Sequence, residues 1–232
     1  MLDTLLDLVF PQWCAGCGRW DTPLCEECRA EFLSRWRDCS ADAPFLMLVR
    51  EDGEEPAFPV FCLGTYEGRR RRCIISWKNQ ASAPLDHAMA SLIPDVAGLA
   101  LPEHVTVVPA PSSPSRERRG MFVAGVLGQQ VAELGGWRYA NVLRKAKRNW
   151  KREIELRADV ALGRARRGLR IQARGAKSRA MSVRRLNGDV VLVDDVLTTG
   201  ATLAGAAHAV ADAGGRVVGA FVLASAKNPR RV

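Results

Sequence analysis

The chain has 232 residues, of which 47% are hydrophobic and 25% are charged, a composition typical of a globular protein. Thirty-four lysines and arginines against 25 acidic residues give a formal net charge of +9, which favours an anionic partner such as a nucleic acid or a phosphorylated small molecule. No apolar run approaches the ~20 residues that span a bilayer, and the first ten residues carry acids where a signal peptide carries lysine or arginine. We therefore expect a cytoplasmic protein.

Four of the seven cysteines form two C-x-x-C pairs near the N-terminus: Cys14, Cys17, Cys25 and Cys28. Because the cytosol keeps thiols reduced, we interpret the pairs as metal ligands rather than disulfides, and we favour zinc over an iron–sulfur cluster. Gly16 and Gly18 are expected to allow tight turns after the first pair. A site closed by four thiolates has no position left for water, so we expect a structural role. The singly spaced Cys39, Cys62 and Cys73 are expected to be buried thiols.

The composition divides the chain into three parts. Residues 1–41 have the profile of a small metal-stapled module, and residues 42–59 are rich in proline and acids, which predicts a connector on the surface. Residues 60–232 are then expected to form the main domain, which begins with a strand and turn at FCLGTYEG.

The central part of the main domain alternates strand and helix signals. Residues 104–110 are β-branched and predict a buried strand, followed by a loop rich in proline, serine and arginine. Apolar residues between 123 and 134 recur at helical spacing, and the two glycines at 135 and 136 are expected to end that helix. Residues 144–185 are dense in arginine and lysine, which predicts a solvated helix followed by a mobile loop.

The C-terminal part predicts a parallel sheet. Residues 190–194 are nearly all apolar, as expected for a strand that is covered on both faces. A short loop, a helix of small residues from about 203 to 210 and a second apolar strand at VVGAFVLAS follow it. Strand, helix and strand in this order form a βαβ unit.

The stretch VVLVDDVLTTGATL, residues 190–203, carries the strongest chemical signal. Asp194 and Asp195 follow an apolar strand and should lie at the carboxyl edge of a parallel sheet, where open α/β folds bind ligands. Carboxylates accept hydrogen bonds from ribose hydroxyls, whereas backbone N–H groups at a helix N-terminus bind phosphate. The alternative is a helix capped by one threonine beside two solvated acids. That alternative explains neither the acid pair nor the T-T-G-x-T that follows it.

This pattern resembles the 5-phosphoribosyl-1-pyrophosphate (PRPP) signature of type I phosphoribosyltransferases. The resemblance implies an α/β fold with a helix-flanked parallel sheet, ribose binding by Asp194 and Asp195, and Mg²⁺ bound with the substrate. It also implies that the 5-phosphate lies against Leu197, Thr198, Thr199, Gly200, Ala201 and Thr202. The loop after the earlier strand would bind pyrophosphate through Ala110, Pro111, Ser112, Arg116 and Arg119, although an ordinary basic surface loop is the alternative.

The order of the motifs resembles the ComF/GntX family over nearly the full length. The shared features are the four-cysteine module, the segment from Tyr66 to Lys78, a V-P-x-P loop with a downstream Arg119-Gly120, and the C-terminal motif. The chain departs from the family where Met121, Phe122 and Val123 replace the usual F-N-Q. Thr198 stands where purine-salvage transferases of this fold place an acidic general base, which disfavours a 6-oxopurine acceptor.

Two functions remain open from the sequence. The first is phosphoribosyl transfer to an unknown acceptor with release of pyrophosphate. The second, suggested by the link of the resembled family to competence, is a non-catalytic protein of DNA uptake or use that binds single-stranded DNA. Base stacking would then need aromatic side chains beside basic ones, for which Trp77 and Trp150 are candidates. Lys78 is interpreted either as a pyrophosphate or nucleic-acid contact or as a solvated lysine.

Overall fold

The computed structural model describes residues 12–32, 34–145, 170–171, 181–182 and 186–226. Its centre is a six-stranded sheet in the order β1-β4-β11-β10-β5-β6. The four inner strands, β4 (Val60–Cys62), β11 (Gly215–Ser225), β10 (Gly188–Leu197) and β5 (Val105–Pro109), are parallel to one another. The edge strand β6 (Arg138–Tyr139) continues the parallel arrangement, whereas β1 (Arg37–Asp38) pairs antiparallel with β4.

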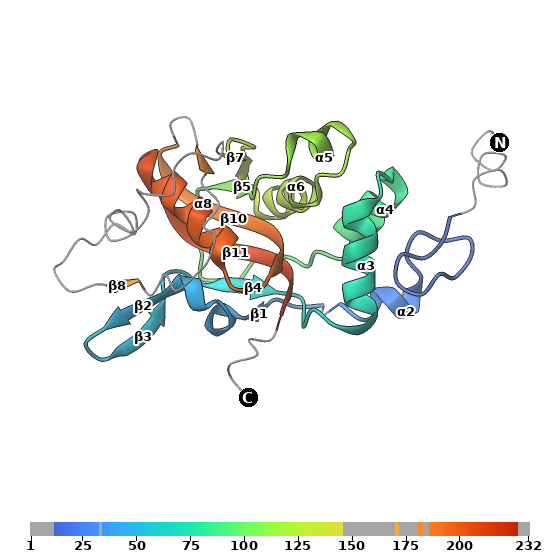
Figure 1. Cartoon of the computed structure of the whole chain (residues 1–232), viewed down its shortest axis with the longest axis horizontal. Coiled ribbons are helices and arrows are strands. Elements are labelled where there is room, and N and C mark those ends of the chain that lie inside the picture. Colours follow the sequence, from blue (N-terminus) through green and yellow to red (C-terminus); the bar gives the residue numbers. More distant parts are fainter. Residues whose placement is uncertain (1–11, 33, 146–169, 172–180, 183–185, 227–232) are drawn as a thin grey trace.

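Helices cover both faces of this sheet (Figure 1). Helix α6 (Val123–Gly135) packs on β10 and β5, and α8 (Ala201–Asp212) packs on β11 and β10 from the other face. Helices α3 (Gly68–Asn79) and α4 (Ala83–Ala90) join the side of α6, and α3 stands between the sheet and the short helix α2 (Glu26–Arg29). The short helix α5 (Pro114–Arg118) follows β5. No helix among the described residues is long and apolar enough to cross a membrane.

The smaller elements lie beside α8. Two 3₁₀ turns, η1 (Ser40–Asp42) and η2 (Pro44–Leu46), lead into a small sheet in the order β3-β2-β8. Its strands are β2 (Met47–Arg50), β3 (Gly53–Pro56) and β8 (Arg170–Ile171). A further pair joins β7 (Arg144–Lys145) to β9 (Met181–Ser182). The solvated helix and loop expected over residues 144–185 fall largely outside the described residues.

The alternation of side chains along β10 divides the core into two parts. Val191 and Val193 pack in one cluster with α3, α4 and α6, whereas Val190 and Leu192 pack in the other with α8. Such alternation follows from the two-residue period of a strand. Both faces of β10 are therefore buried, which confirms the covered strand that its apolar sequence predicts.

Several predicted elements are confirmed. The predicted strands are β5, β10 and β11, and the predicted helices are α6 and α8. Helix α6 is capped by Gly136, whose φ of 62° lies in the left-handed region that glycine adopts without strain.

Residues 42–59 do not form the exposed connector that their composition predicts. They contain η2, β2 and β3. They bury Leu48, and they place Ala43, Leu46 and Phe58 in the core cluster that includes α8. The acids and prolines lie between these buried positions, so the average composition of the segment conceals its packing. Residues 44–46 of η2 thus contact α8, which lies more than 150 residues later in the chain.

Helices α3 and α4 had no predicted counterpart. In α3, Cys73, Ile74 and Trp77 are fully buried, and their spacing of one and three residues is that of a single helix face. Four consecutive arginines precede this face and obscure the apolar pattern. Because Trp77 is 0% exposed, its interpretation as a base-stacking side chain is wrong. Trp150 lies outside the described residues.

We expect Trp77→Ala to lower the free energy of unfolding by about 3–5 kcal/mol, the usual effect of truncating a buried aromatic side chain. The indole also donates a hydrogen bond to Asp86 of α4, which the substitution removes. Chemical denaturation measures the change. The matched control is Trp13→Ala, because Trp13 is 56% exposed and packs only edge-to-face on Trp20, a contact worth about 0.5–1.5 kcal/mol. Equal losses in the two variants would contradict this description of the core.

Candidate functional site

The carboxyl ends of the parallel strands bring three loops to one edge of the sheet. The last residues paired between β10 and β5 are Val193 and Pro109. The backbone N–H of Ala110 then donates to the carbonyl of Val193 at 2.7 Å, so the loop after β5 starts beside the end of β10. On the other side, the backbone N–H of Ser225 in β11 donates to the carbonyl of Gly64 in the loop after β4 at 2.9 Å.

Asp194 and Asp195 occupy this edge at the end of β10, next to the start of the β5 loop. Both side chains are half-buried, and the carboxylate of Asp194 accepts a hydrogen bond from the backbone N–H of Asp195 at 2.8 Å. By the alternation of the strand, Asp195 follows Val193 onto the face that α3 and α6 cover. The acid pair therefore directs its carboxylates to two faces at the carboxyl edge of the sheet.

Lys78 is a site residue whose role the sequence left open. Its Nζ lies 2.7 Å from Oδ2 of Asp195, and the two side chains are 37% and 15% exposed. Lys78 is the penultimate residue of α3, the helix that packs on the same face as Asp195. The lysine therefore places a positive charge at the acid pair, while more than a third of its side chain stays exposed to solvent.

Gly200 forms the turn between β10 and α8. Its φ is 80°, which is a left-handed conformation, and a Cβ there would lie 3.1 Å from Ala43 Cβ and 3.2 Å from Leu46 Cγ. A side chain at this position would thus be strained by the backbone and crowded by η2. The carbonyl of Thr199 also accepts a hydrogen bond from the backbone N–H of Phe45 at 3.0 Å. The turn is held from one side by residues 43–46.

The turn leaves polar groups facing outward. The side chains of Thr198 and Thr199 are exposed, and Thr202 is half-buried in the first turn of α8. The twelve-residue helix α8 begins directly after Gly200, so its first backbone N–H groups point toward the same edge as the acids. Backbone donors and hydroxyls together provide an environment suited to an anion.

The loop after β5 lies at the same edge. Ala110 and Pro111 are buried, Ser112 is half-buried, and Ser113 caps α5 by accepting a hydrogen bond from the backbone N–H of Arg116. Arg116 is half-buried, whereas Arg118 and Arg119 are exposed. The structure therefore places the start of the predicted pyrophosphate loop next to the acid pair, with its arginines one helical turn further along the chain.

The four cysteines of the two C-x-x-C pairs meet in one cluster. All four Sγ atoms lie within 4.8 Å of one another, and Cys25 Sγ lies 3.6 Å from both Cys14 Sγ and Cys17 Sγ. Four sulfurs at 2.3 Å from a tetrahedral zinc would be about 3.8 Å apart. The cluster could therefore hold a metal such as zinc with little movement.

The environment of Cys14 favours its thiolate. Burial opposes ionisation, but hydrogen bonds from the backbone N–H groups of Cys25, Cys17 and Gly16 outweigh it and lower the Cys14 pKa to about 6. The N–H of Cys25 lies 3.4 Å from Cys14 Sγ. By contrast, burial and the neighbouring thiols raise the pKa of Cys28. A metal ion would reverse that rise, since it binds thiolates in preference to thiols.

The two glycines of the cluster have different roles. Gly18 has a φ of 75° and makes the tight turn that the sequence predicts. Gly16 is instead required by close approach, because a Cβ there would lie 2.6 Å from Sγ of both Cys28 and Cys73. The fully buried thiol of Cys73, on α3, thus lies against the cluster without belonging to it. Cys39 and Cys62 are buried elsewhere, as predicted.

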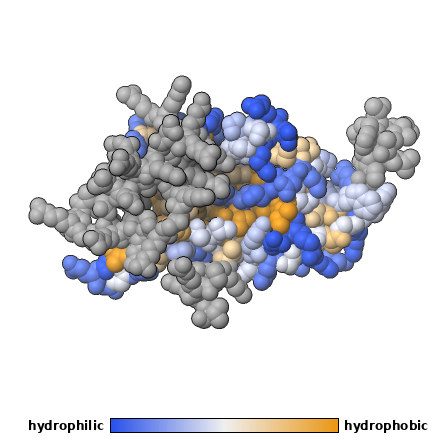
Figure 2. All heavy atoms as spheres, in the orientation of Figure 1, coloured by the Kyte–Doolittle hydropathy of each residue, from blue (hydrophilic) through white to orange (hydrophobic). Residues whose placement is uncertain are grey.

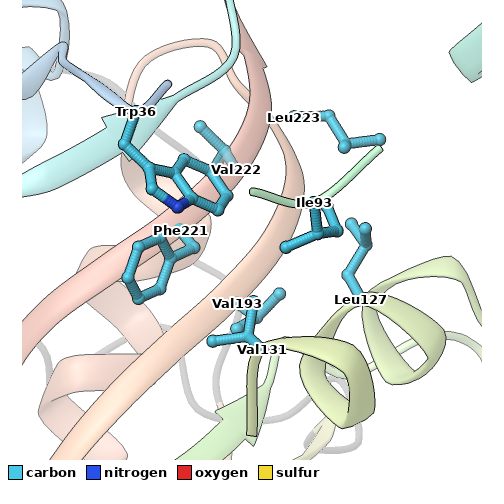
Figure 3. Close-up of a pocket in the computed structure, with 8 residues that line it drawn as sticks. All are labelled: Trp36, Ile93, Leu127, Val131, Val193, Phe221, Val222 and Leu223. Atoms are coloured by element: carbon cyan, nitrogen blue, oxygen red, sulfur yellow. The ribbon is translucent and has the colours of Figure 1, made fainter. Parts of the chain in front are cut away.

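Two hollows formed by the described residues lie away from this edge. Figure 3 shows eight apolar side chains from β10, β11, α6 and neighbouring segments converging on a gap beneath Trp36, which is too small for a water molecule. Apolar residues also come to the surface near the middle of the face in Figure 2. A larger cavity of about 350 Å³ lies at the opposite edge of the sheet, where Glu103, His104 and Asp189 precede or begin β5 and β10.

Comparison with known families places this edge in context. The family model of the phosphoribosyl transferase domain matches residues 142–232, which include β10, the Gly200 turn, α8 and β11. The match covers less than half of the chain and leaves out the four cysteines, α3 and the β5 loop. A comparison with curated proteins finds no match. The mostly parallel, helix-flanked sheet, the phosphoribosyltransferase domain and the four-cysteine cluster together confirm the predicted fold class.

Proposed function

We propose that the chain binds PRPP at the carboxyl edge of the sheet and transfers its phosphoribosyl group to an acceptor with release of pyrophosphate. The observation that carries this proposal is the acid pair at the end of β10, followed at once by the Gly200 turn and the N-terminus of α8. A ribose phosphate needs acceptors for its hydroxyls and donors for its phosphate at a short separation. This loop offers both, within the segment that the family model matches.

In the proposed complex, Asp194 and Asp195 accept hydrogen bonds from the 2- and 3-hydroxyls of the ribose. The 5-phosphate lies on the backbone N–H groups and hydroxyls of residues 197–202, and the pyrophosphate lies toward residues 110–112, Arg116 and Arg119. Lys78 offsets the charge of Asp195, so that two neighbouring carboxylates can approach an anionic ligand. During transfer the bond from C1 to the pyrophosphate oxygen breaks, and the acceptor forms the new bond at C1.

Oxygen ligands suit Mg²⁺, and both the carboxylates of the acid pair and the phosphate oxygens of PRPP are of this kind. The ion would neutralise part of the pyrophosphate charge. Because it would be held mainly by PRPP, we expect PRPP binding to depend on Mg²⁺. In this proposal the chain's own residues orient the sugar and hold its phosphate.

We expect the double variant Asp194→Asn, Asp195→Asn to bind PRPP at least ~10-fold more weakly, because hydrogen bonds to charged groups are worth about 1.5–3 kcal/mol. Calorimetric titration with PRPP and Mg²⁺ measures the affinity. Thr199→Val should also weaken binding by removing an exposed hydroxyl from the turn.

The control for these variants is Asp212→Asn at the other end of α8, where the side chain is exposed and lies 3.7 Å from His208. It should bind PRPP as the unmodified protein does. If the unmodified protein binds no PRPP in the presence of Mg²⁺, or the double variant binds it equally well, the proposed function is wrong. If PRPP binds as expected, a screen of bases and nucleotides for pyrophosphate release identifies the acceptor.

The four-cysteine cluster is proposed to hold one structural zinc ion. Its sulfur spacing fits a tetrahedral ion, and the cluster leaves no ligand position open for water. The segment around it is short, and among its described elements are hydrogen-bonded turns between Gln12 and Pro23 and the four-residue helix α2. A bound ion would therefore supply much of the stability of this segment.

We expect about one zinc ion per chain in the purified protein, on the basis of one closed four-thiolate site. Metal analysis of Cys14→Ser and Cys28→Ser should show its loss. Cys39→Ser serves as the control, because Cys39 is equally buried but lies in the other core cluster. Zinc that persists in both ligand variants would overturn the assignment.

Single-stranded DNA is a second candidate ligand, favoured by one observation besides the net charge. Trp13 and Trp20 flank the first cysteine pair, are each 56% exposed and pack edge-to-face with ring centroids 4.5 Å apart. Arg19 lies beside them in the chain. Exposed aromatic rings next to basic side chains are the features on which bases stack. In this second candidate function, Trp13 and Trp20 would stack on the bases, which the buried Trp77 cannot do.

If this second candidate is correct, a fluorescent oligonucleotide should bind at low salt and dissociate steeply as salt rises, since counterions are released on binding. Trp13→Ala with Trp20→Ala should weaken binding by roughly 1–3 kcal/mol per stacked base. Binding that is undetectable at low salt would remove DNA from consideration. Binding that is unaffected by the double substitution would leave charge alone as its cause.

A further inference from the structure

Helix α3 connects the four-cysteine cluster to the proposed PRPP site. Its first two turns contact the N-terminal segment, and its penultimate residue contacts the acid pair. Figure 1 shows α3 standing upright between the sheet and α2. We define the cysteine module as residues 12–32, which contain all four cysteines and α2. Four residues of α3 that contact the module are Arg69, Arg70, Arg72 and Cys73.

Two of these contacts are made by arginines at the surface. Arg72 Nε donates to the carbonyl of Gly16 at 2.7 Å, inside the first cysteine pair. Arg69 forms an ion pair with Glu27 of α2 at 3.2 Å. Both contacts join α3 to the parts of the module that a bound metal would fix.

The other two contacts are buried. Cys73 is fully buried next to Cys28. The Sγ atoms of both lie where a Cβ at Gly16 would clash with them. Arg70 is 8% exposed and donates both to the carbonyl of Glu31 and to the carbonyl of Thr65, the latter at 2.6 Å. Its guanidinium occupies the position of a Cβ at Gly64, whose φ is 138°. Arg70 thus ties the end of the module to the loop after β4, at the ligand-binding edge.

The distance from these contacts to the site is short. Lys78 follows Cys73 by five residues, which corresponds to about 7.5 Å along a helix. Trp77 lies between them and is fully buried, so α3 is packed against the core along this length. A helix packed in this way moves as a rigid rod, and a shift at its module end displaces Lys78 relative to Asp195.

We propose that the cysteine module is a positioning element for the PRPP site, which holds α3 where Lys78 pairs with Asp195. Lys78 is a positioning residue in this scheme, because it acts on the ligand through the carboxylate of Asp195. The inference rests on the proposed function for its ligand. Its structural half, the control of Lys78 by the module, can be measured without PRPP.

The first experiment measures the reactivity of Lys78 toward an amine-reactive acetylating ester by mass spectrometry, with the other lysines of the full chain as references. The variant Arg69→Gln, Arg72→Gln removes two module contacts and keeps the buried ones. Lys78 should be acetylated at least about 5-fold faster in it, the lower end of typical coupling between sites. Cys17→Ser, which perturbs the metal ligands, should act in the same direction, and circular dichroism checks that each variant is folded.

The matched control is Arg71→Gln. Arg71 lies between the two substituted arginines but faces Tyr66, with its guanidinium carbon 5.7 Å from the ring centroid, instead of the module. It should leave the Lys78 rate unchanged. An unchanged rate in folded Arg69→Gln, Arg72→Gln protein would overturn the proposal, as would an equal rise in the Arg71 control.

The second experiment combines the module variant with substitutions of Lys78 and measures PRPP affinity with Mg²⁺. Lys78→Arg preserves the ion pair and should bind nearly as the unmodified protein does, whereas Lys78→Met should bind about 5-fold more weakly. The module variant should weaken binding when Lys78 is present and have no further effect in Lys78→Met protein. Equal weakening in both backgrounds would show that the module does not act through Lys78.

The two experiments separate the two proposals. If the unmodified protein binds no PRPP, the proposed function is wrong and the acetylation rates alone decide whether the module positions Lys78. If PRPP binds but the rates and the combined variants show no coupling, the proposed function stands and the positioning role of the module is wrong.

Discussion

The ion pair between Lys78 and Asp195 joins helix α3 to the end of strand β10. Asp194 and Asp195 are neighbours at the end of β10, and two adjacent carboxylates repel each other and any anionic ligand. A cation 2.7 Å from Asp195 offsets part of this repulsion. The cation comes from a helix outside the region that the family model matches, so the site depends on elements beyond the βαβ unit.

Each face of β10 supplies a different support for the site. On one face, η2 and α8 enclose Gly200, so the turn that would hold phosphate is fixed by contact with Ala43 and Leu46. On the other face, α3 and α6 cover the strand, and Cys28 and Cys73 belong to the same core cluster as Trp77 and Val193. The ligand-binding edge is thus built by local sequence but is held in place by segments from the beginning of the chain.

Sequence reasoning succeeded where a local pattern determines the structure. The apolar run of β10, the acid pair and the glycine turn are contiguous, so their arrangement follows from strand and helix geometry alone. The four cysteines could be recognised because two C-x-x-C pairs a few residues apart are typical of tetrahedral zinc ligands. The helix that ends at Gly136 could likewise be predicted from spacing and a left-handed glycine.

The sequence failed where contacts join distant segments. The segment 42–59 is acidic and rich in proline on average, yet Leu46 and Phe58 are buried because α8 and β4 provide the opposing surface. The pairing of Lys78 with Asp195 could not be predicted from the sequence, because more than 100 residues separate the two and no local pattern relates α3 to β10. Gly16 lies in a turn, as expected, but the sequence did not show that the neighbouring sulfurs of Cys28 and Cys73 also require its lack of a side chain.

Hydrogen–deuterium exchange of the full chain with and without PRPP and Mg²⁺ tests most directly where the ligand binds. We expect slower exchange in the loop after β5 and in residues 197–203, with no change around the cavity at Glu103, His104 and Asp189. Protection confined to that cavity, at the opposite edge of the sheet, would contradict binding at the acid pair.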